Sequence, residues 1–178
     1  VAADDWHAIA SDPRVAISAC DGPRFLMTNR ESYDVVISCA PEPATACANR
    51  YFTREYFAAA SRALTPHGVF VTSINASERL ENLVAQRAAS IHRTLSESFP
   101  RLKVTAGARL YFFAGGRSSQ ITLDRNELAS LSKWANLSTK IFRPEYFKVC
   151  EELDPDKIAL VISRIEEARN SERPYWYN

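Results

Sequence analysis

Two short apolar runs stand at the centre of the hydrophobic pattern of this sequence. The first is Val35-Val36-Ile37 and the second is Val69-Phe70-Val71. Between them lie a proline-containing loop and an amphipathic stretch, 53–64, in which Thr53 is a good N-cap. Strand, loop, helix and strand in this order predict a βαβ crossover, the unit of a parallel sheet. Because ligands bind at the carboxyl ends of such strands, we expect chemistry in the loop after Ile37.

The remaining pattern places further strands and helices around this crossover. The expected elements are, in order, strand 15–19, helix 21–27, strand 33–38, helix 53–64, strand 69–72, helix 77–99, strands 102–105 and 109–114, and helices 123–134, 144–150 and 154–169. The predicted fold is α/β, a Rossmann-like parallel sheet with an antiparallel hairpin at its edge. We expect residues 1–116 to form the sheet domain and 117–178 a helical C-terminal extension packed on it, as one structural unit. The aromatic end, 173–177, is expected to pack on the body.

Composition excludes several classes of protein. The 178 residues are 46% hydrophobic and 24% charged, which indicates a soluble, folded domain rather than a disordered chain. A net charge of +1 provides no basic field, so no nucleic-acid partner is expected. No apolar run reaches the ~20 residues of a membrane helix, so membrane contact would come through a partner or a missing segment. The chain begins at Val1 rather than methionine, which fits a processed product or a fragment. The compartment stays open.

The cysteines and histidines do not indicate a metal site or a disulfide scaffold. Cys20, Cys39, Cys47 and Cys150 form no CxxC pair, and the three histidines lack metal-ligand spacing. Free, buried thiols are therefore expected. A Cys39–Cys47 bridge across the loop is the open alternative.

Several segments carry a resemblance to a known family. DPRVAISACDGPRFL, YDVVIS, YFTREYF and LTPHGVFV follow one another as in the catalytic domain of spermidine and spermine synthases. These aminopropyltransferases have a methyltransferase-like Rossmann fold. APEPATACANRYFTREYFAAASRALTPHGVFV and the ending NSERPYWYN are similar to a bacterial branch in which the domain is often fused to membrane helices. The resemblance covers roughly Asp12 to Tyr177, and it rests on order and spacing rather than on one motif.

The resemblance implies a nucleotide site that is incomplete here. In the family, a glycine-rich loop and a ribose-binding acid precede the strand at Val15, and this sequence begins after them. That half of the site is missing, or is supplied by another segment or chain. Asp21 and Gly22 match the position where the family contacts adenine. Asp21 is equally suited to cap the helix that follows, and both interpretations stay open.

The catalytic loop also departs from the family. Cys39 occupies the position of the catalytic aspartate, and Glu42 replaces a second acid. A neutral thiol with a pKa near ~8.5 cannot hold a cationic amine as a carboxylate does. The longer Glu42 is displaced by ~1 Å, which can cost ~100-fold in rate. Cys39 is therefore either a nucleophile or a small buried residue, and Glu42 either a residual acid or a solvent-facing charge.

Two functional hypotheses result. The first is a degenerate, non-catalytic synthase-like domain that serves as a structural or assembly subunit with other protein subunits, a membrane complex being one setting. The alternative is an aminopropyltransferase that uses decarboxylated S-adenosylmethionine and a polyamine. No cofactor is certain; decarboxylated S-adenosylmethionine or methylthioadenosine would bind if the site survives. We expect 49–51 to order the loop against the helix at Thr53 rather than to contact substrate.

Overall fold

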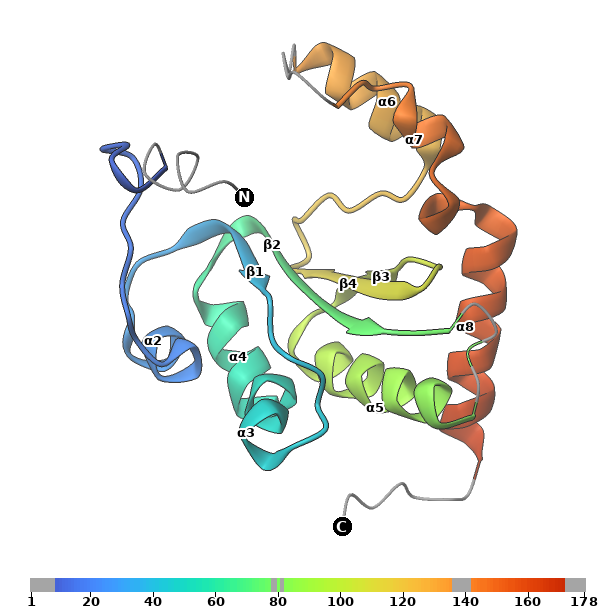
Figure 1. Ribbon diagram of the computed structural model, residues 1–178, viewed down its shortest axis with the longest axis horizontal. Coiled ribbons are helices and arrows are strands. Elements are labelled where there is room, and N and C mark those ends of the chain that lie inside the picture. The colour runs from blue at the N-terminus through green and yellow to red at the C-terminus, as the bar shows by residue number, and fades with distance from the viewer. Residues whose placement is uncertain (1–8, 78–79, 81, 136–141, 172–178) are drawn as a thin grey trace.

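The computed structural model describes residues 9–77, 80, 82–135 and 142–171. Figure 1 shows an open sheet with helices on one side and a helical arm standing away from it. The helices are α2 (Gly22–Thr28), α3 (Ala46–Asn49), α4 (Arg54–Arg62), α5 (Asn82–Ser98), α6 (Arg125–Trp134), α7 (Tyr146–Val149) and α8 (Pro155–Asn170), with 3-10 turns η1 (Arg50–Phe52) and η2 (Glu151–Leu153). The strands are β1 (Tyr33–Ser38), β2 (Leu64–Asn75), β3 (Arg101–Val104) and β4 (Arg109–Gly115).

The sheet has the order β1-β2-β4-β3. β1 and β2 are parallel and are connected through α4, which confirms the predicted crossover. β4 runs antiparallel to both β2 and β3, which confirms the hairpin at the edge. The hairpin turn contains Gly107 with φ of +98°, a conformation that favours glycine. The α/β, Rossmann-like fold class is therefore as predicted.

The core lies between the sheet and the helices α4 and α5. Phe70 of β2 is fully buried at its centre. Its ring stacks on Phe99 with centroids 5.6 Å apart, and meets Phe57 edge-on at 5.7 Å. α8 packs against the other side of α5, through residues that include Val161 and Ile165. These apolar contacts fix α4 and α5 beneath one face of the sheet.

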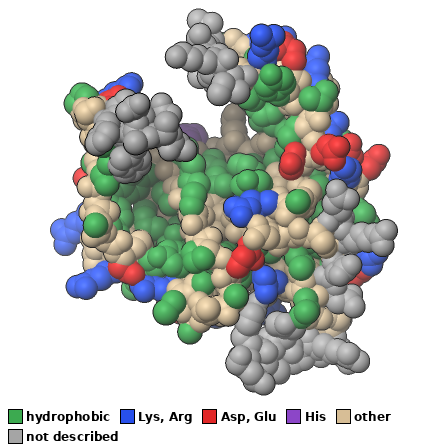
Figure 2. Space-filling model, viewed as in Figure 1, with side chains coloured by type: hydrophobic (Ala, Val, Ile, Leu, Met, Phe, Trp, Pro, Cys, Tyr) green, Lys and Arg blue, Asp and Glu red, His purple; other side chains and the backbone are tan. Residues whose placement is uncertain are grey.

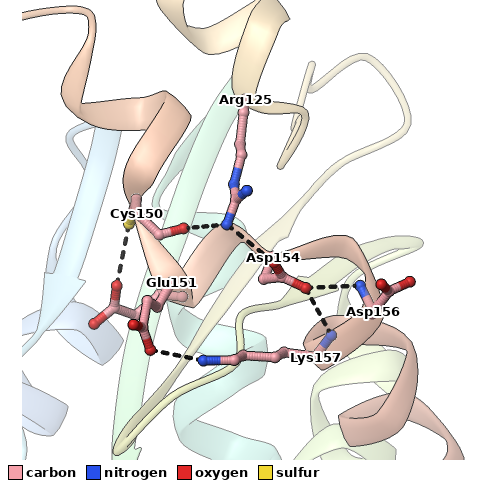
Figure 3. A network of polar contacts seen from close by, with 7 residues as sticks. Arg125, Cys150, Glu151, Asp154, Asp156 and Lys157 are labelled. Carbon is pink, nitrogen blue, oxygen red and sulfur yellow. Dashed lines mark hydrogen bonds and ion pairs between the residues drawn. The ribbon is translucent and has the colours of Figure 1, made fainter.

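A polar network orders the C-terminal helices, and Figure 3 shows it from close by. The Arg125 guanidinium, at the start of α6, donates to the Cys150 carbonyl oxygen at 2.7 Å and lies 3.4 Å from Asp154. Asp154 is also the N-cap of α8 and accepts from the backbone N–H groups of Asp156 and Lys157. Hydrogen bonding from the Lys157 N–H leads the effects that lower the pKa of Asp154. Asp124 caps α6 in the same way, because it accepts from the backbone N–H groups of Asn126 and Glu127.

Two strand predictions differ from the structure. Residues 15–19 have no regular secondary structure, so the predicted strand is wrong there. β2 begins at Leu64, which pairs with Tyr33, rather than at residue 69, and the register is irregular between this pair and Val35–Val69. A Cβ at Gly68 would lie 2.8 Å from the Tyr33 carbonyl oxygen, which explains the glycine at this close approach.

The long helix starts at Asn82 rather than at residue 77. The four cysteines are free, so the Cys39–Cys47 bridge is not formed. The expectation of buried thiols was also wrong, because Cys20, Cys39 and Cys47 are exposed. In the described part of the chain, no helix has the length and apolarity needed to cross a bilayer. The aromatic end at 173–177 lies outside the described residues, and the division at 116 stays a prediction.

Candidate functional site

The loop that leaves β1 contains the positions that the sequence singled out. Cys39 is the first residue after β1, and its thiol is exposed. Just before it, the buried Ser38 hydroxyl accepts a hydrogen bond from Tyr56 Oη at 3.0 Å. Burial is the main cause that raises the pKa of Tyr56, so this phenol stays protonated near neutral pH. The end of β1 is thus anchored on α4. Cys39 is exposed, and the described residues provide no hydrogen-bonded general base for its thiol.

Glu42 is held by two internal partners. Its Oε1 accepts from the backbone N–H of Asn75, at the end of β2, at 2.6 Å. Its Oε2 lies 3.2 Å from Nη1 of Arg87 on α5. The two charged side chains are 30% and 25% exposed, so this pair is partly withdrawn from water. Glu42 therefore joins the loop to β2 and α5, and its charge is already balanced by an arginine.

Asp21 and Gly22 lie at the start of α2. The Asp21 carboxylate is the N-cap, because its Oδ1 accepts from the backbone N–H of Arg24 at 3.0 Å. The same oxygen forms an ion pair with the Arg50 guanidinium. Gly22 faces Tyr51, since a Cβ on it would lie 3.5 Å from the tyrosine ring. Oδ2 can still accept a hydrogen bond from an adenine amino group, so capping and nucleotide contact are compatible here.

A shallow hollow of about 470 Å³ beside the loop includes Glu42 in its lining, but not Cys39, Asp21 or Gly22. It is lined by residues of the loop, α3 and η1, among them Pro41, Glu42, Cys47, Arg50 and Tyr51. Arg50 reaches from this hollow to Asp21 at the start of α2. Both acidic candidates, Glu42 and Asp21, are therefore paired with arginines. No group of His, Cys, Asp or Glu able to hold a metal is found among the residues described.

The sequence analysis missed Arg87. Its position in the helical pattern contained a signal, because it lies three residues after Val84 and next to Ala88, at the edge of the apolar face of α5. A charge at such a position requires a partner, since an unpaired buried charge is costly. The partner, Glu42, lies 45 residues away. Only the packing of α5 against the crossover brings the two together.

A second cavity, of about 390 Å³, lies between the end of β2, the β3–β4 turn and α8. Apolar residues such as Leu80 and Leu160 line it together with Glu151, Glu152 and Lys157. Its carboxylates are engaged, because Glu151 pairs with Lys157 at 2.6 Å and Glu152 accepts from the Cys150 thiol at 3.1 Å. It holds none of the candidate site residues, so it is a cavity of the C-terminal helices rather than of the loop.

Comparison with known proteins identifies relatives by sequence. Residues 4–107 match the family model described as "Spermine/spermidine synthase domain". The polyamine aminopropyltransferase of Streptococcus pneumoniae serotype 4 is 32% identical over 100 residues, which are 56% of this chain and 34% of that protein. The polyamine aminopropyltransferase of Clostridium perfringens strain ATCC 13124 is 25% identical over 166 residues, 88% of this chain and 55% of that protein.

Comparison with solved structures gives the same fold. A spermidine synthase, solved in complex with the transition state analogue AdoDATO, superposes with a TM-score of 0.67 at 18% identity. That match covers 92% of this chain and 55% of the solved chain. The chain thus spans between a third and about half the length of these relatives.

Proposed function

Because this chain belongs to the spermine/spermidine synthase family, we propose that it is a degenerate, non-catalytic member of it that acts as a structural or assembly subunit. It keeps the family crossover and the loop after β1. Its two acidic candidates, Glu42 and Asp21, serve the fold as a loop bridge and a helix cap. Its partners would be other protein subunits. The resemblance to the membrane-fused branch makes a membrane complex the first setting to examine.

The contact between Glu42 and Arg87 is the observation that carries this proposal. A polyamine substrate is a multiple cation and needs carboxylates whose charge is available to it. Here an amine would have to displace both Arg87 and the Asn75 N–H from Glu42. Cys39 at the end of β1 has no charge to offer while it is a thiol. The loop therefore lacks the negative potential that would bind and deprotonate an amine.

A second candidate is an aminopropyltransferase that uses decarboxylated S-adenosylmethionine and a polyamine. The names of the curated relatives favour it, since both are polyamine aminopropyltransferases. Asp21 and Gly22 would then contact the adenine, and Glu42 would be released from Arg87 to receive the amine. Residues contributed from outside this chain would complete such a site.

The test is aminopropyl transfer by this chain together with the partners that copurify with it, so that residues supplied from outside the chain are present. Decarboxylated S-adenosylmethionine and putrescine are supplied, and methylthioadenosine release is followed by chromatography. We expect no product above the protein-free control. Titration calorimetry with methylthioadenosine separately reports whether a nucleotide site survives around Asp21. Product formation that Glu42→Gln lowers at least tenfold would overturn the proposal and establish the second candidate.

A gain-of-function variant sharpens this test. Cys39→Asp with Arg87→Gln restores an acid at the end of β1 and frees Glu42 from its ion pair. If pairing is what excludes an amine, this variant binds putrescine more tightly than the parent chain. Arg54→Gln is the matched control, because it removes an arginine from the exposed pair with Glu97, away from the loop. Equal putrescine binding by the parent and both variants would show that Arg87 is not the obstacle.

A further inference from the structure

The cavity between the β3–β4 turn and α8 has an apolar floor. Its volume of about 390 Å³ is within the ~300–1,000 Å³ that is typical of small-molecule sites. Leu80, Ala106 and Val161 line it and are only 4%, 2% and 7% exposed, so they form its deep part. Leu160 of α8 also lines it and is half-exposed, so it lies nearer to the mouth. The interior therefore suits an apolar group rather than a charge.

Backbone contacts fix the walls of this cavity. The Ala106 N–H donates to the Glu152 carbonyl oxygen at 2.9 Å, which joins the β3–β4 turn to η2. A Cβ on Gly107 would lie 3.0 Å from Cγ of Glu152, so the glycine allows an unusually close approach of the turn to η2. On the β2 side, the Ala76 N–H donates to the Ala108 carbonyl oxygen at 2.7 Å. A cavity with fixed walls needs little reorganisation to bind a ligand.

The mouth of the cavity is acidic. Its charged lining residues are Glu151, Glu152 and Lys157, and two carboxylates with one ammonium leave a net charge of −1. Figure 2 shows acidic side chains gathered where η2 meets the start of α8. Lys157 is held by Glu151, whose Oε2 lies 2.6 Å from the lysine Nζ (Figure 3). The charge that remains is that of Glu152, and it favours a cationic ligand.

Glu152 has one carboxylate oxygen available for such a ligand. Its Oε2 accepts from the Cys150 thiol at 3.1 Å, and this hydrogen bond is the largest cause that lowers the pKa of Glu152. The carboxylate is therefore ionised at neutral pH. Its Oε1 lies toward Gly107, beside the cavity, and accepts no hydrogen bond from the described residues. An ammonium can bind this oxygen without displacing another partner.

From this geometry we propose that the cavity binds an amphipathic primary amine, whose single ammonium pairs with Oε1 of Glu152 and whose apolar body lies against Leu160 and Val161. An aliphatic diamine or polyamine fits less well, because its second ammonium would enter the apolar floor. An anion would have to take Lys157 from Glu151. The ligand contacts both η2 and α8, so its binding stabilises the packing of the C-terminal helices. No residue of the loop after β1 lines this cavity, so the proposal does not depend on the function proposed above.

The test uses phenethylamine as the probe, because it has one ammonium and a compact apolar body. Titration calorimetry with the 178-residue chain should show one site per chain, with half-saturation below about 1 mM. Phenethyl alcohol, which is neutral, and putrescine, which has an ammonium at each end, should each bind at least about tenfold more weakly. Because the amine binds the folded chain, the Tm should rise by about 3–6 °C at ten times the dissociation constant.

Two substitutions locate the site. Glu152→Gln removes the charge but keeps an oxygen that can accept from the Cys150 thiol, and it should weaken binding about tenfold or more. Leu160→Gln removes part of the apolar wall and should weaken binding about fivefold. Glu166→Gln and Ile162→Gln are the matched controls, because they make the same kinds of change at exposed positions of α8 outside the lining, and they should leave the affinity unchanged.

Each other outcome overturns the proposal. No saturable binding of phenethylamine would show that the cavity does not take an amine. Equal binding of phenethyl alcohol would remove the role of the Glu152 charge, and tighter binding of putrescine would show that a diamine is recognised instead. An affinity that Glu152→Gln and Leu160→Gln both leave unchanged would place the amine elsewhere. If Glu152→Gln melts below the parent chain, Leu160→Gln decides the test, since its position is half-exposed.

Discussion

Replacing Glu42 tests whether the loop after β1 is stabilised by its internal partners. Glu42→Ala removes the hydrogen bond to the Asn75 N–H and the ion pair with Arg87. A hydrogen bond to a charged group contributes about 1.5–3 kcal/mol. The lower end of this range applies here, because Asn75 is exposed and water can take the place of the carboxylate as the hydrogen-bond acceptor. The partly exposed ion pair adds about 0.5–1 kcal/mol. We therefore expect the free energy of unfolding to fall by about 2–2.5 kcal/mol.

Glu42→Gln separates the two contributions. Its amide oxygen can still accept from the Asn75 N–H, so only the charge is lost, at about 1 kcal/mol. The assay is urea unfolding followed by circular dichroism, with thermal melting as a second measure. For a chain of this size, 1 kcal/mol corresponds to a shift of about 2–4 °C in Tm. Adding Arg87→Met to each variant completes a double-mutant cycle, in which we expect a coupling of about 0.5–1 kcal/mol.

Glu97→Gln is the control for this reasoning. Its pair with Arg54 is largely exposed, because 41% of the Glu97 side chain and 74% of the Arg54 side chain are accessible to water. We expect a change below about 0.5 kcal/mol. If Glu42→Ala is no more destabilising than this control, Glu42 does not brace the loop, and its carboxylate is available for another role.

Three further predictions concern the cap, a buried histidine and the core. Asp21→Ala removes the α2 cap and the Arg50 ion pair, so the free energy of unfolding, followed by thermal melting, should fall by about 1 kcal/mol. Asp21→Asn keeps the cap and should lower the free energy of unfolding less. Equal losses in the two variants would contradict the capping role. Burial is the largest cause that lowers the pKa of His92 in the folded chain, and the charge of Arg169 is the second. The pKa of this histidine is therefore higher in the unfolded chain, so the unfolded state binds more protons as the pH falls. The free energy of unfolding should therefore decline as the pH falls below about 6.5. The urea midpoint of His92→Gln should decline less over the same pH range than that of the parent chain. Parallel pH profiles for the two proteins would refute this. Phe70→Ala should lower the free energy of unfolding by about 3–5 kcal/mol, because the ring is fully buried. Phe113→Ala, on the opposite and more exposed face of the sheet, should lower it clearly less, and the reverse order would contradict this assignment of the two faces.

Local signals in the sequence were sufficient for much of the fold. Thr53 was predicted as a cap, and Asp21 as a cap in one of two interpretations, because a capping side chain acts on N–H groups two or three residues away. The strand at 109–114 was likewise predicted from its own residues, and burial alternates along it in the structure. Residues 65–68 were expected to lie outside the strand, and although β2 includes them, the pairing with β1 passes from Tyr33–Leu64 to Val35–Val69 without them. The local preference of Pro66 and Gly68 is thus retained as an irregularity within the strand.

The candidate site was predicted less completely than the fold. Cys39 and Glu42 could be placed after β1 because strand ends follow from the apolar run. The partners of the acidic residues could not, since Arg50 lies 29 residues from Asp21 and Arg87 lies 45 residues from Glu42. Such distances in sequence are closed only by the packing of α2, α4 and α5. Whether a charge is available or already paired is therefore a property of the folded chain.

The outer edge of β1 also has a kinetic consequence. The outward-facing backbone groups of β1 have no strand partner among the described residues. Two of its side chains, Val35 and Ile37, are apolar and exposed. Such an edge can template the addition of strands from other molecules. Edge-to-edge association is a bimolecular process, so its rate rises with the square of concentration, while refolding of one chain does not depend on concentration. The lifetime of this domain on its own is therefore set by how much of it is present, and dilute preparations should outlast concentrated ones.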